Sequence, residues 1–411
     1  MSYKGSYLIS KCELIPNGTS LEENYDITRG NPTINYYESV RSPSISMTVS
    51  FIDIDQMISR EGITGGEMID LEVIIPDFEE KFKIESKTQK LVLNAVRDVM
   101  TSTNKQTATL EFVSDESLVN ETSRVNKKFT GNVTQIVKEL LETEPKGIQT
   151  KKEITTDDAV NKYSFLGNLK RPFETIQWLC PKAQASTNNF GFLFFENLDG
   201  FHFKSIEGLL QQEPEFLYTK PDRPTETDLR IIESNLNRSN DIGKNARMGM
   251  YSNKTIYIDI QNETYEETDF DISELKKDVK VIESLKEKPT KLMFRMLDQG
   301  ALQKGSKKED GEKKNELAVY QNKSYIRNNL LFSQSLNISI PINPDLRAGQ
   351  MIEVRFPFKK EASDETSGDG KESDNDISGK YLISELRHIM GGGKSSTQLN
   401  LIRDLFTKDN A

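Results

Sequence analysis

The sequence contains few of the side chains on which catalysis and metal binding depend. Its 411 residues include two histidines, two cysteines and one tryptophan. Cys12 and Cys180 stand far apart, without the spacing of metal ligands or of a disulfide framework, so we expect synthesis in a reducing compartment. Gly-x-Ser-x-Gly, His-Glu-x-x-His and Cys-x-x-Cys motifs do not occur. These absences predict no catalytic, cofactor-binding or metal-binding residues, and a chain that is not an enzyme.

Long apolar runs and an excess of positive charge are also missing. No apolar stretch approaches the length that crosses a membrane, and the N-terminus lacks the apolar core of a signal peptide. The net charge of −10 argues against an electrostatic grip on nucleic acid, which needs clustered Lys and Arg. An acidic chain can still line a channel through which DNA slides. We expect a protein that is made in a cytoplasm and does not insert into a membrane.

The two histidines and one glycine-rich loop have structural explanations. His202 lies between Phe201 and Phe203 on a predicted strand, and His388 ends a predicted strand before a glycine turn. Gly391–Ser395 resembles the end of a phosphate-binding loop, but His388 occupies the position where that motif requires its first glycine. The residues that follow alternate like a strand, whereas the motif needs a helix there. We therefore predict a hairpin turn and no phosphate site.

The most informative pattern that is present is a duplication. Three strand-like segments occur twice in the same order, at 44–53, 66–73 and 107–115 and again at 335–343, 349–356 and 396–404. In the first of them Ile45, Met47, Val49 and Phe51 share one face, and Ser and Thr occupy the other. Common strand composition alone would also produce such alternation. The alternative that we favour is one β-module that was copied and then separated by inserts.

Different residue patterns divide the rest of the chain. Val133–Leu141 has the apolar spacing of an amphipathic helix, and a second helix is predicted to begin at Pro172. Asn197–Gly200 predicts the turn of a β-hairpin. The predicted fold is β-rich α+β, with two similar antiparallel β-barrel domains and α/β inserts. The predicted parts are a first barrel at 1–117, an α/β insert at 118–222, a second barrel at 223–262 and 323–407, an insert with a helix and a mobile loop (304–314) at 263–322, and a disordered loop at 362–377.

This organisation resembles the central hub protein of contractile-tail phage baseplates of the T-even type, with type VI secretion spike-hub proteins as distant relatives. The resemblance lies in Gly379–His388 followed by Ser396–Leu405, which is similar to the final hairpin of that family. Pro172–Glu174, Phe190–Phe195 and Gln212–Pro214 are similar to its α/β insert, and Gly66–Val73 resembles the second strand of its first barrel.

The resemblance implies a structural role in a virion. Such hubs are trimers whose six barrels form a ring, which adapts a six-fold tail tube to a three-fold spike. The implied partners are a spike protein that can bear a lysozyme, tail-tube or tube-initiator proteins, and baseplate wedge proteins. DNA would be only passing cargo during genome ejection, and lumen-facing positions are expected to carry carboxylates. The chain would reach the tail baseplate after assembly in the host cytoplasm. Interface residues are left unassigned.

Two other functions fit parts of the sequence. A hexameric protein that terminates the tail tube, or a distal-tail protein, would use one related barrel, but a ring of six chains needs only one copy of the module. A carbohydrate-active tail protein would need aromatic side chains beside paired acids, and a single tryptophan makes this a poor match.

Overall fold

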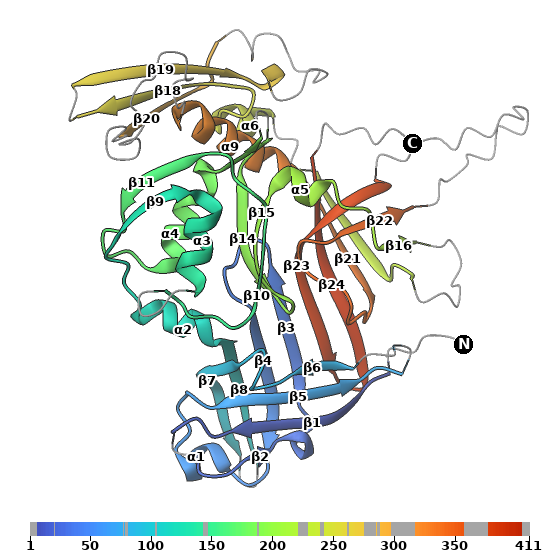
Figure 1. Cartoon of the computed structure of the whole chain (residues 1–411). Helices are drawn as coiled ribbons and strands as arrows, with labels where there is room; N and C mark the ends of the chain where they lie inside the picture. Colours follow the sequence, from blue (N-terminus) through green and yellow to red (C-terminus); the bar gives the residue numbers. More distant parts are fainter. Residues whose placement is uncertain are drawn as a thin grey trace, which may run out of the picture.

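The computed structural model of the chain is mainly antiparallel β-sheet (Figure 1). It describes residues 6–19, 21–76, 78, 81–102, 105–142, 147–186, 189–220, 229–238, 242–260, 263–274, 285, 288–296, 317–356 and 377–404. The loop predicted at 304–314 lies outside the described residues, and so does the loop predicted at 362–377 except for Ile377.

The N-terminal part of the chain forms a first barrel module. Its strands are β1 (Leu8–Ile15), β2 (Tyr25–Asp26), β3 (Thr33–Ser39), β4 (Ser46–Asp53), β5 (Met68–Ile74), β6 (Phe82–Ile84), β7 (Leu91–Ser102) and β8 (Lys105–Ser114), with two short helices, η1 (Thr28–Gly30) and α1 (Met57–Glu61). Strict alternation explains these strands: in β4, Met47, Val49 and Phe51 are buried and Ser46, Thr48 and Ser50 are half-buried. The predicted core face is therefore confirmed.

A second barrel module comes from later segments. Its strands are β16 (Phe216–Thr219), β17 (Glu233–Arg238), β21 (Gln334–Pro341), β22 (Met351–Arg355), β23 (Gly379–Gly391) and β24 (Lys394–Arg403). The two modules join edge to edge in one 14-stranded sheet, whose main order is β17-β21-β24-β23-β3-β4-β8-β7-β5-β1-β2. One apolar core runs through both of them. The fold class predicted from the sequence is confirmed.

The hydrogen-bond pattern repeats between the modules. Val92 of β7 pairs with Met68 and Val113, and Leu382 of β23 pairs in the same way with Met351 and Ile402. Both long strands change register one residue later, between Leu93 and Ala95 and between Ile383 and Glu385. The glycine before β5 donates to Leu93, as the glycine before β22 donates to Ile383. Chance strand composition does not explain a shared bulge.

The structure corrects the alignment of the first repeated segment by two residues. β4 pairs with β8 so that Met47 faces Phe112, and β21 pairs with β24 so that Leu336 faces Leu401. Met47 therefore corresponds to Leu336, whereas aligning the two segments at their first residues, Ser44 and Ser335, sets Met47 against Ile338. A shift of two residues leaves the same side chains facing the core, so the alternation could not reveal it.

Between the modules lies a mixed α/β insert. Its elements are α2 (Asp115–Thr122), β9 (Lys128–Asn132), α3 (Val133–Glu142), β10 (Glu153–Thr156), β11 (Lys162–Leu166), α4 (Pro172–Leu179), η2 (Cys180–Lys182), β12 (Gln184–Ser186), β13 (Asn189–Phe190), β14 (Phe192–Asn197), β15 (Gly200–Ser205) and α5 (Ile206–Leu210). Both predicted helices are present, and β14 and β15 form the predicted hairpin. The apolar faces of α3 and α4 enter a core of their own.

A small distal sheet lies at the end of the molecule opposite β1 and β2 (Figure 1). Its strands are β18 (Ser252–Asp259), β19 (Thr264–Asp271) and β20 (Lys291–Met296), and it is accompanied by α6 (Ile242–Arg247), η3 (Ile272–Glu274) and α9 (Leu317–Leu331). The predicted second barrel at 223–262 included β18, and that assignment is wrong because this strand pairs only with β19 and β20 in the described part of the chain. Alternation indicates a strand but does not select its partner.

The shared bulge generates a prediction at Gly349. This residue has a φ of +91°, and a Cβ there would lie 2.6 Å from Cζ of the buried Phe195 ring. Gly349→Ala is expected to lower the free energy of unfolding by about 3 kcal/mol, through backbone strain and overpacking. Gly392→Ala is the matched control, because its φ is +61° with no atom within 4 Å. It should cost about 1 kcal/mol in a denaturant titration. Equal losses in the two variants would contradict the role of the Phe195 contact.

Candidate functional site: the junction between the two barrels

The two modules meet where β23 pairs with β3. The register runs from Glu385 opposite Ser39 to Met390 opposite Ile34. Across this junction the Arg387 guanidinium donates to Oδ1 of Asn35 at 2.9 Å. The contact is a continuous antiparallel ladder, in which backbone groups supply most of the hydrogen bonds and side chains set the register.

The first module also contains a strand equivalent to β23, and the second module contains a strand equivalent to β3. By hydrogen-bond register, β7 corresponds to β23 and β17 corresponds to β3. Among the described residues, β17 pairs only with β21, and β7 beyond Leu93 pairs only with β8. Val99 and Met100 on β7 and Ile232 before β17 are exposed apolar side chains beside these edges. The chain thus presents two open edges that are equivalent to the two edges it joins internally.

A polar groove of about 570 Å³ lies over the outward face of the junction. It crosses β3, β4, β17, β21, β23 and β24, and hydroxyl and amide side chains contribute most of its polar lining, among them Ser46, Asn235, Asn337, Gln398 and Asn400. Glu233, Glu385 and Arg387 add charges of both signs. This is the wet face of the sheet that the Ser and Thr alternation predicted.

A buried carboxylate fixes three segments at the junction. Glu38 accepts hydrogen bonds from the Tyr36 hydroxyl at 2.8 Å and from the backbone N–H groups of Leu198 and Ala348 at 2.9 and 2.7 Å. Burial raises the pKa of Glu38, although the nearby Arg347 guanidinium opposes the shift. These bonds tie β3 of the first module to the β14–β15 hairpin and to the loop before β22. Loss of Glu38 would leave three donors without an acceptor.

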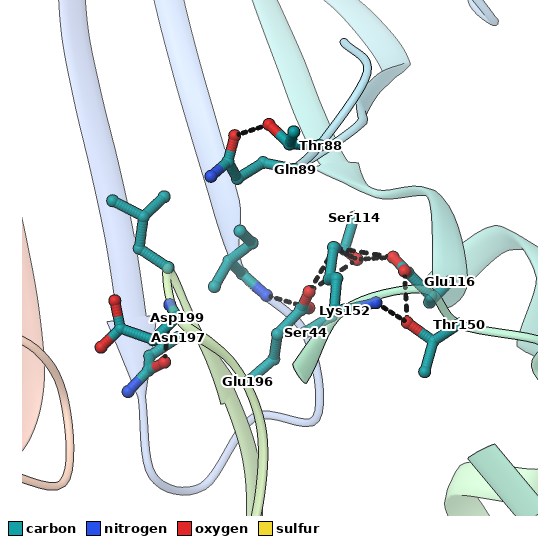
Figure 2. Close-up of polar contacts among 12 residues, drawn as sticks. Ser44, Thr88, Gln89, Ser114, Glu116, Thr150, Lys152, Glu196, Asn197 and Asp199 are labelled. Atoms are coloured by element: carbon teal, nitrogen blue, oxygen red, sulfur yellow. Dashed lines mark hydrogen bonds and ion pairs between the residues drawn. The ribbon is translucent and has the colours of Figure 1, made fainter. Parts of the chain in front are cut away.

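A second buried cluster connects the insert to the first module (Figure 2). Lys152 Nζ lies 2.6 Å from Glu196 Oε1 and 2.7 Å from Glu116 Oε2. The Ser114 hydroxyl oxygen lies 2.6 Å from Glu116 Oε2 and 3.0 Å from Glu196 Oε1, and its one proton is available to either carboxylate. Glu196 also accepts the backbone N–H of Ile45 at 3.0 Å. Burial raises the pKa of Glu196 to about 7 against the attraction of Lys152. Burial opposes ionisation of Glu116 too, but the Lys152 ammonium holds the pKa of Glu116 below its usual value.

The histidines have structural positions. His388 is buried beside Tyr36 and Phe82, with Nδ1 2.8 Å from Thr397 Oγ1, and burial lowers its pKa to about 3. His202 bonds Oδ1 of Asn197 at 2.8 Å, and burial lowers its pKa to about 4. Gly391 pairs with Lys394 in the β23–β24 hairpin, so the glycine-rich loop is the predicted turn.

The described part of the chain contains no cluster of three or more His, Cys, Asp or Glu side chains that could hold a metal ion. None of its helices is both long and apolar enough to cross a membrane. Sequence reasoning assigned no interface residue and missed both buried carboxylates. A signal existed for Glu38, because it shares a strand face with the apolar Ile34 and Tyr36. Nothing in the sequence distinguished Glu196 from other acids.

Comparisons with known proteins agree on the fold. No protein-family model matches the chain, and no curated protein matches it. The tail protein from Neisseria meningitidis MC58 is similar at a TM-score of 0.56 and 10% sequence identity, with 97% of each chain covered. The 43 kDa tail protein of prophage MuSo2 from Shewanella oneidensis is similar at a TM-score of 0.52 and 11% sequence identity, with 96% of this chain and 98% of that chain covered. For a type VI secretion system component from E. coli the TM-score is 0.45 and the sequence identity 11%, with 97% of this chain and 76% of that chain covered.

The chain therefore has the fold of these two tail proteins, as the resemblance in the sequence implied, at a sequence identity of 10–11%. The structural similarity extends over nearly the whole chain, so both modules and the insert belong to the shared architecture.

The pKa of Glu196 generates a prediction about stability. A carboxyl whose pKa is higher in the folded state, here about 7, stabilises the fold below its ordinary value of 4.5, and this stabilisation is lost as the pH rises to about 7. Glu196→Gln should remove this loss. Its free energy of unfolding is expected to rise relative to the unmodified chain between pH 4.5 and 7, by at most about 1.4 kcal/mol per pH unit.

Glu116→Gln is the matched control from the same cluster. Because the pKa of Glu116 is lowered, its contribution is lost only as the pH falls below about 4.5. This variant should be less stable than the unmodified chain at pH 4.5, and the difference should narrow only partly toward pH 7, because the Glu116 charge is one of the causes that raise the pKa of Glu196. Urea titrations at several pH values measure both differences. A Glu196→Gln curve parallel to that of the unmodified chain would show that Glu196 does not titrate in this range.

Proposed function

We propose that this chain is the central hub of a contractile phage tail baseplate, a trimer that joins a six-fold tail tube to a three-fold spike. The observation that supports it most is the pair of open edges. Within one chain, β23 of the second module pairs with β3 of the first. The same contact between chains would pair β7 of one chain with β17 of the next. Three chains would then contribute six modules to one closed ring, in which β7 and β17 are both paired.

The proposed ring would place the polar groove on the wall of its lumen. The groove follows the outward face of the sheet across the junction, and repeated at every junction it would line the lumen. Its hydroxyl and amide side chains neither attract nor repel phosphate strongly, and Glu233 and Glu385 are its exposed carboxylates. A lumen of this kind would let DNA pass without binding. The expected lining rich in carboxylates is thus replaced in this proposal by a mostly uncharged one.

The proposed role is structural and not catalytic. The modules of the proposal are those of the observed sheet, so β16, predicted within the insert at 118–222, belongs to the second module, and β18 does not. The α/β insert and the distal sheet would lie outside the ring. There they would contact the spike and the baseplate wedge, and the barrel rim would contact the tube. The hexameric alternative is disfavoured because six chains of this kind would supply twelve modules, twice the number that a six-fold ring uses.

The register of the proposed contact is testable with engineered cysteines. Ile389 opposite Asn35 corresponds to Met100 opposite Asn235 of the next chain. Directly opposed residues of antiparallel strands have Cα atoms about 4.5–5.5 Å apart, a distance that a disulfide spans. Met100→Cys combined with Asn235→Cys should form dimers and trimers linked by disulfides on a non-reducing gel after mild oxidation.

Met100→Cys combined with Ile232→Cys is the matched control, because its second cysteine lies three residues from the expected register. The native cysteines should not form disulfides, since Cys12 and Cys180 are buried and burial raises the pKa of each thiol to about 12. Cross-linking that is equally efficient in both double variants, or absent from both, would contradict the proposed β7–β17 contact.

A further inference from the structure

The outward face of the distal sheet is apolar. Along β18 and β20 every second residue points outward, and on β19 Tyr265 lies directly opposite Ile258 on the same face. Leu292, Phe294 and Met296 on β20 are exposed to 58%, 67% and 78%, and Tyr265 to 71%. We name this surface the distal face and define it by its apolar side chains, Ile256, Ile258, Tyr265, Leu292, Phe294 and Met296.

The opposite face of the same sheet is already covered. Thr255 and Tyr257 on β18 are buried, and Asn253 accepts a hydrogen bond of 2.7 Å from Asn322 of α9. A sheet packed on one side normally presents polar residues on the other, as the main sheet does with its Ser and Thr. The distal face breaks this pattern with contiguous large apolar side chains, which in a soluble protein marks a contact surface for another protein.

Acidic residues border the distal face along one strand. Glu267 and Asp269 of β19 point outward in the rows next to Tyr265. Lys254 lies 2.9 Å from Glu267 and 3.5 Å from Asp269, so one cation is shared between two carboxylates. The border retains a net negative charge. A partner that covers the apolar side chains would gain from Lys or Arg placed above β19.

The size of the face matches one helix. Neighbouring strands lie about 4.8 Å apart, so the outer strands of a three-stranded sheet are separated by about 10 Å, which is the diameter of an α-helix with its side chains. A second copy of this chain is a poorer occupant. Identical faces meet about a two-fold axis, and the closed three-chain ring has no such axis, an argument that rests on the proposed function.

We infer that the distal face binds one amphipathic helix of a partner protein. The apolar stripe of that helix packs on β18 and β20, and its basic border lies along β19. A helix packed on a sheet buries the exposed apolar area in the ordinary two-layer arrangement.

Two synthetic peptides test the inference. Both are helices of roughly 18 residues, about five turns, with the same leucine stripe, and they differ in having Lys or Glu along one border of it. Each is labelled and titrated with the full chain while fluorescence anisotropy is measured. The Lys peptide should bind at least about tenfold more tightly than the Glu peptide. Phe294→Ser combined with Met296→Ser should weaken binding of the Lys peptide by about tenfold or more.

Two further double variants complete the test. Glu267→Gln with Asp269→Asn should reduce the preference for the Lys peptide. Leu8→Ser with Leu166→Ser, at positions that are 61% and 62% exposed elsewhere on the chain, should change nothing. Equal binding of both peptides, or binding that survives the Phe294 and Met296 changes, would overturn the inference.

Light scattering separates this inference from the proposed ring. The chain with Phe294→Ser and Met296→Ser should keep the oligomeric mass of the unmodified chain, because the proposed ring contact uses β7 and β17. A fall in mass caused by these substitutions would identify a second copy as the occupant and overturn the inference. A ring that fails the cysteine test while the Lys peptide still binds would overturn the proposed function alone.

Discussion

The unpaired backbone of an edge strand is the constraint on which this architecture depends. A strand with free N–H and C=O groups either pairs, is covered or risks uncontrolled association. Within the chain the duplication pairs one edge strand of each module, because β23 of the second module pairs with β3 of the first. The same duplication leaves β7 and β17 as matching edges, so the proposed ring would need no new type of contact. The symmetry of the proposed assembly would follow from a repeat inside one chain.

Buried carboxylates give the barrels a fixed relation to the rest of the molecule. Glu38 and Glu196 each accept bonds from segments more than a hundred residues away in the sequence, Glu38 at the module junction and Glu196 at the insert. A charge in the interior is costly unless its partners are in place, so each site holds its segments in one arrangement.

Much of this fold could be predicted from the sequence because β-strands and amphipathic helices leave periodic patterns. The alternation in 44–53 identified β4, and Pro172 marked the start of α4. Strand partners could not be predicted in the same way, since backbone hydrogen bonds are the same for every sequence. This is why β18 was placed in the wrong sheet and one repeat was aligned two residues out of register. The edges of the proposed interface, β7 and β17, could be recognised only from strand pairing, and Glu196 only from its three-dimensional neighbours.

The oligomeric mass of the full chain tests the central claim most directly. Light scattering over a series of concentrations should approach about 140 kDa, three times the chain mass of 46.8 kDa. A trimer of this mass is what the proposed ring of six modules requires. A stable hexamer, or a monomer that persists at every concentration with and without a spike protein, would contradict the ring and the role proposed for it.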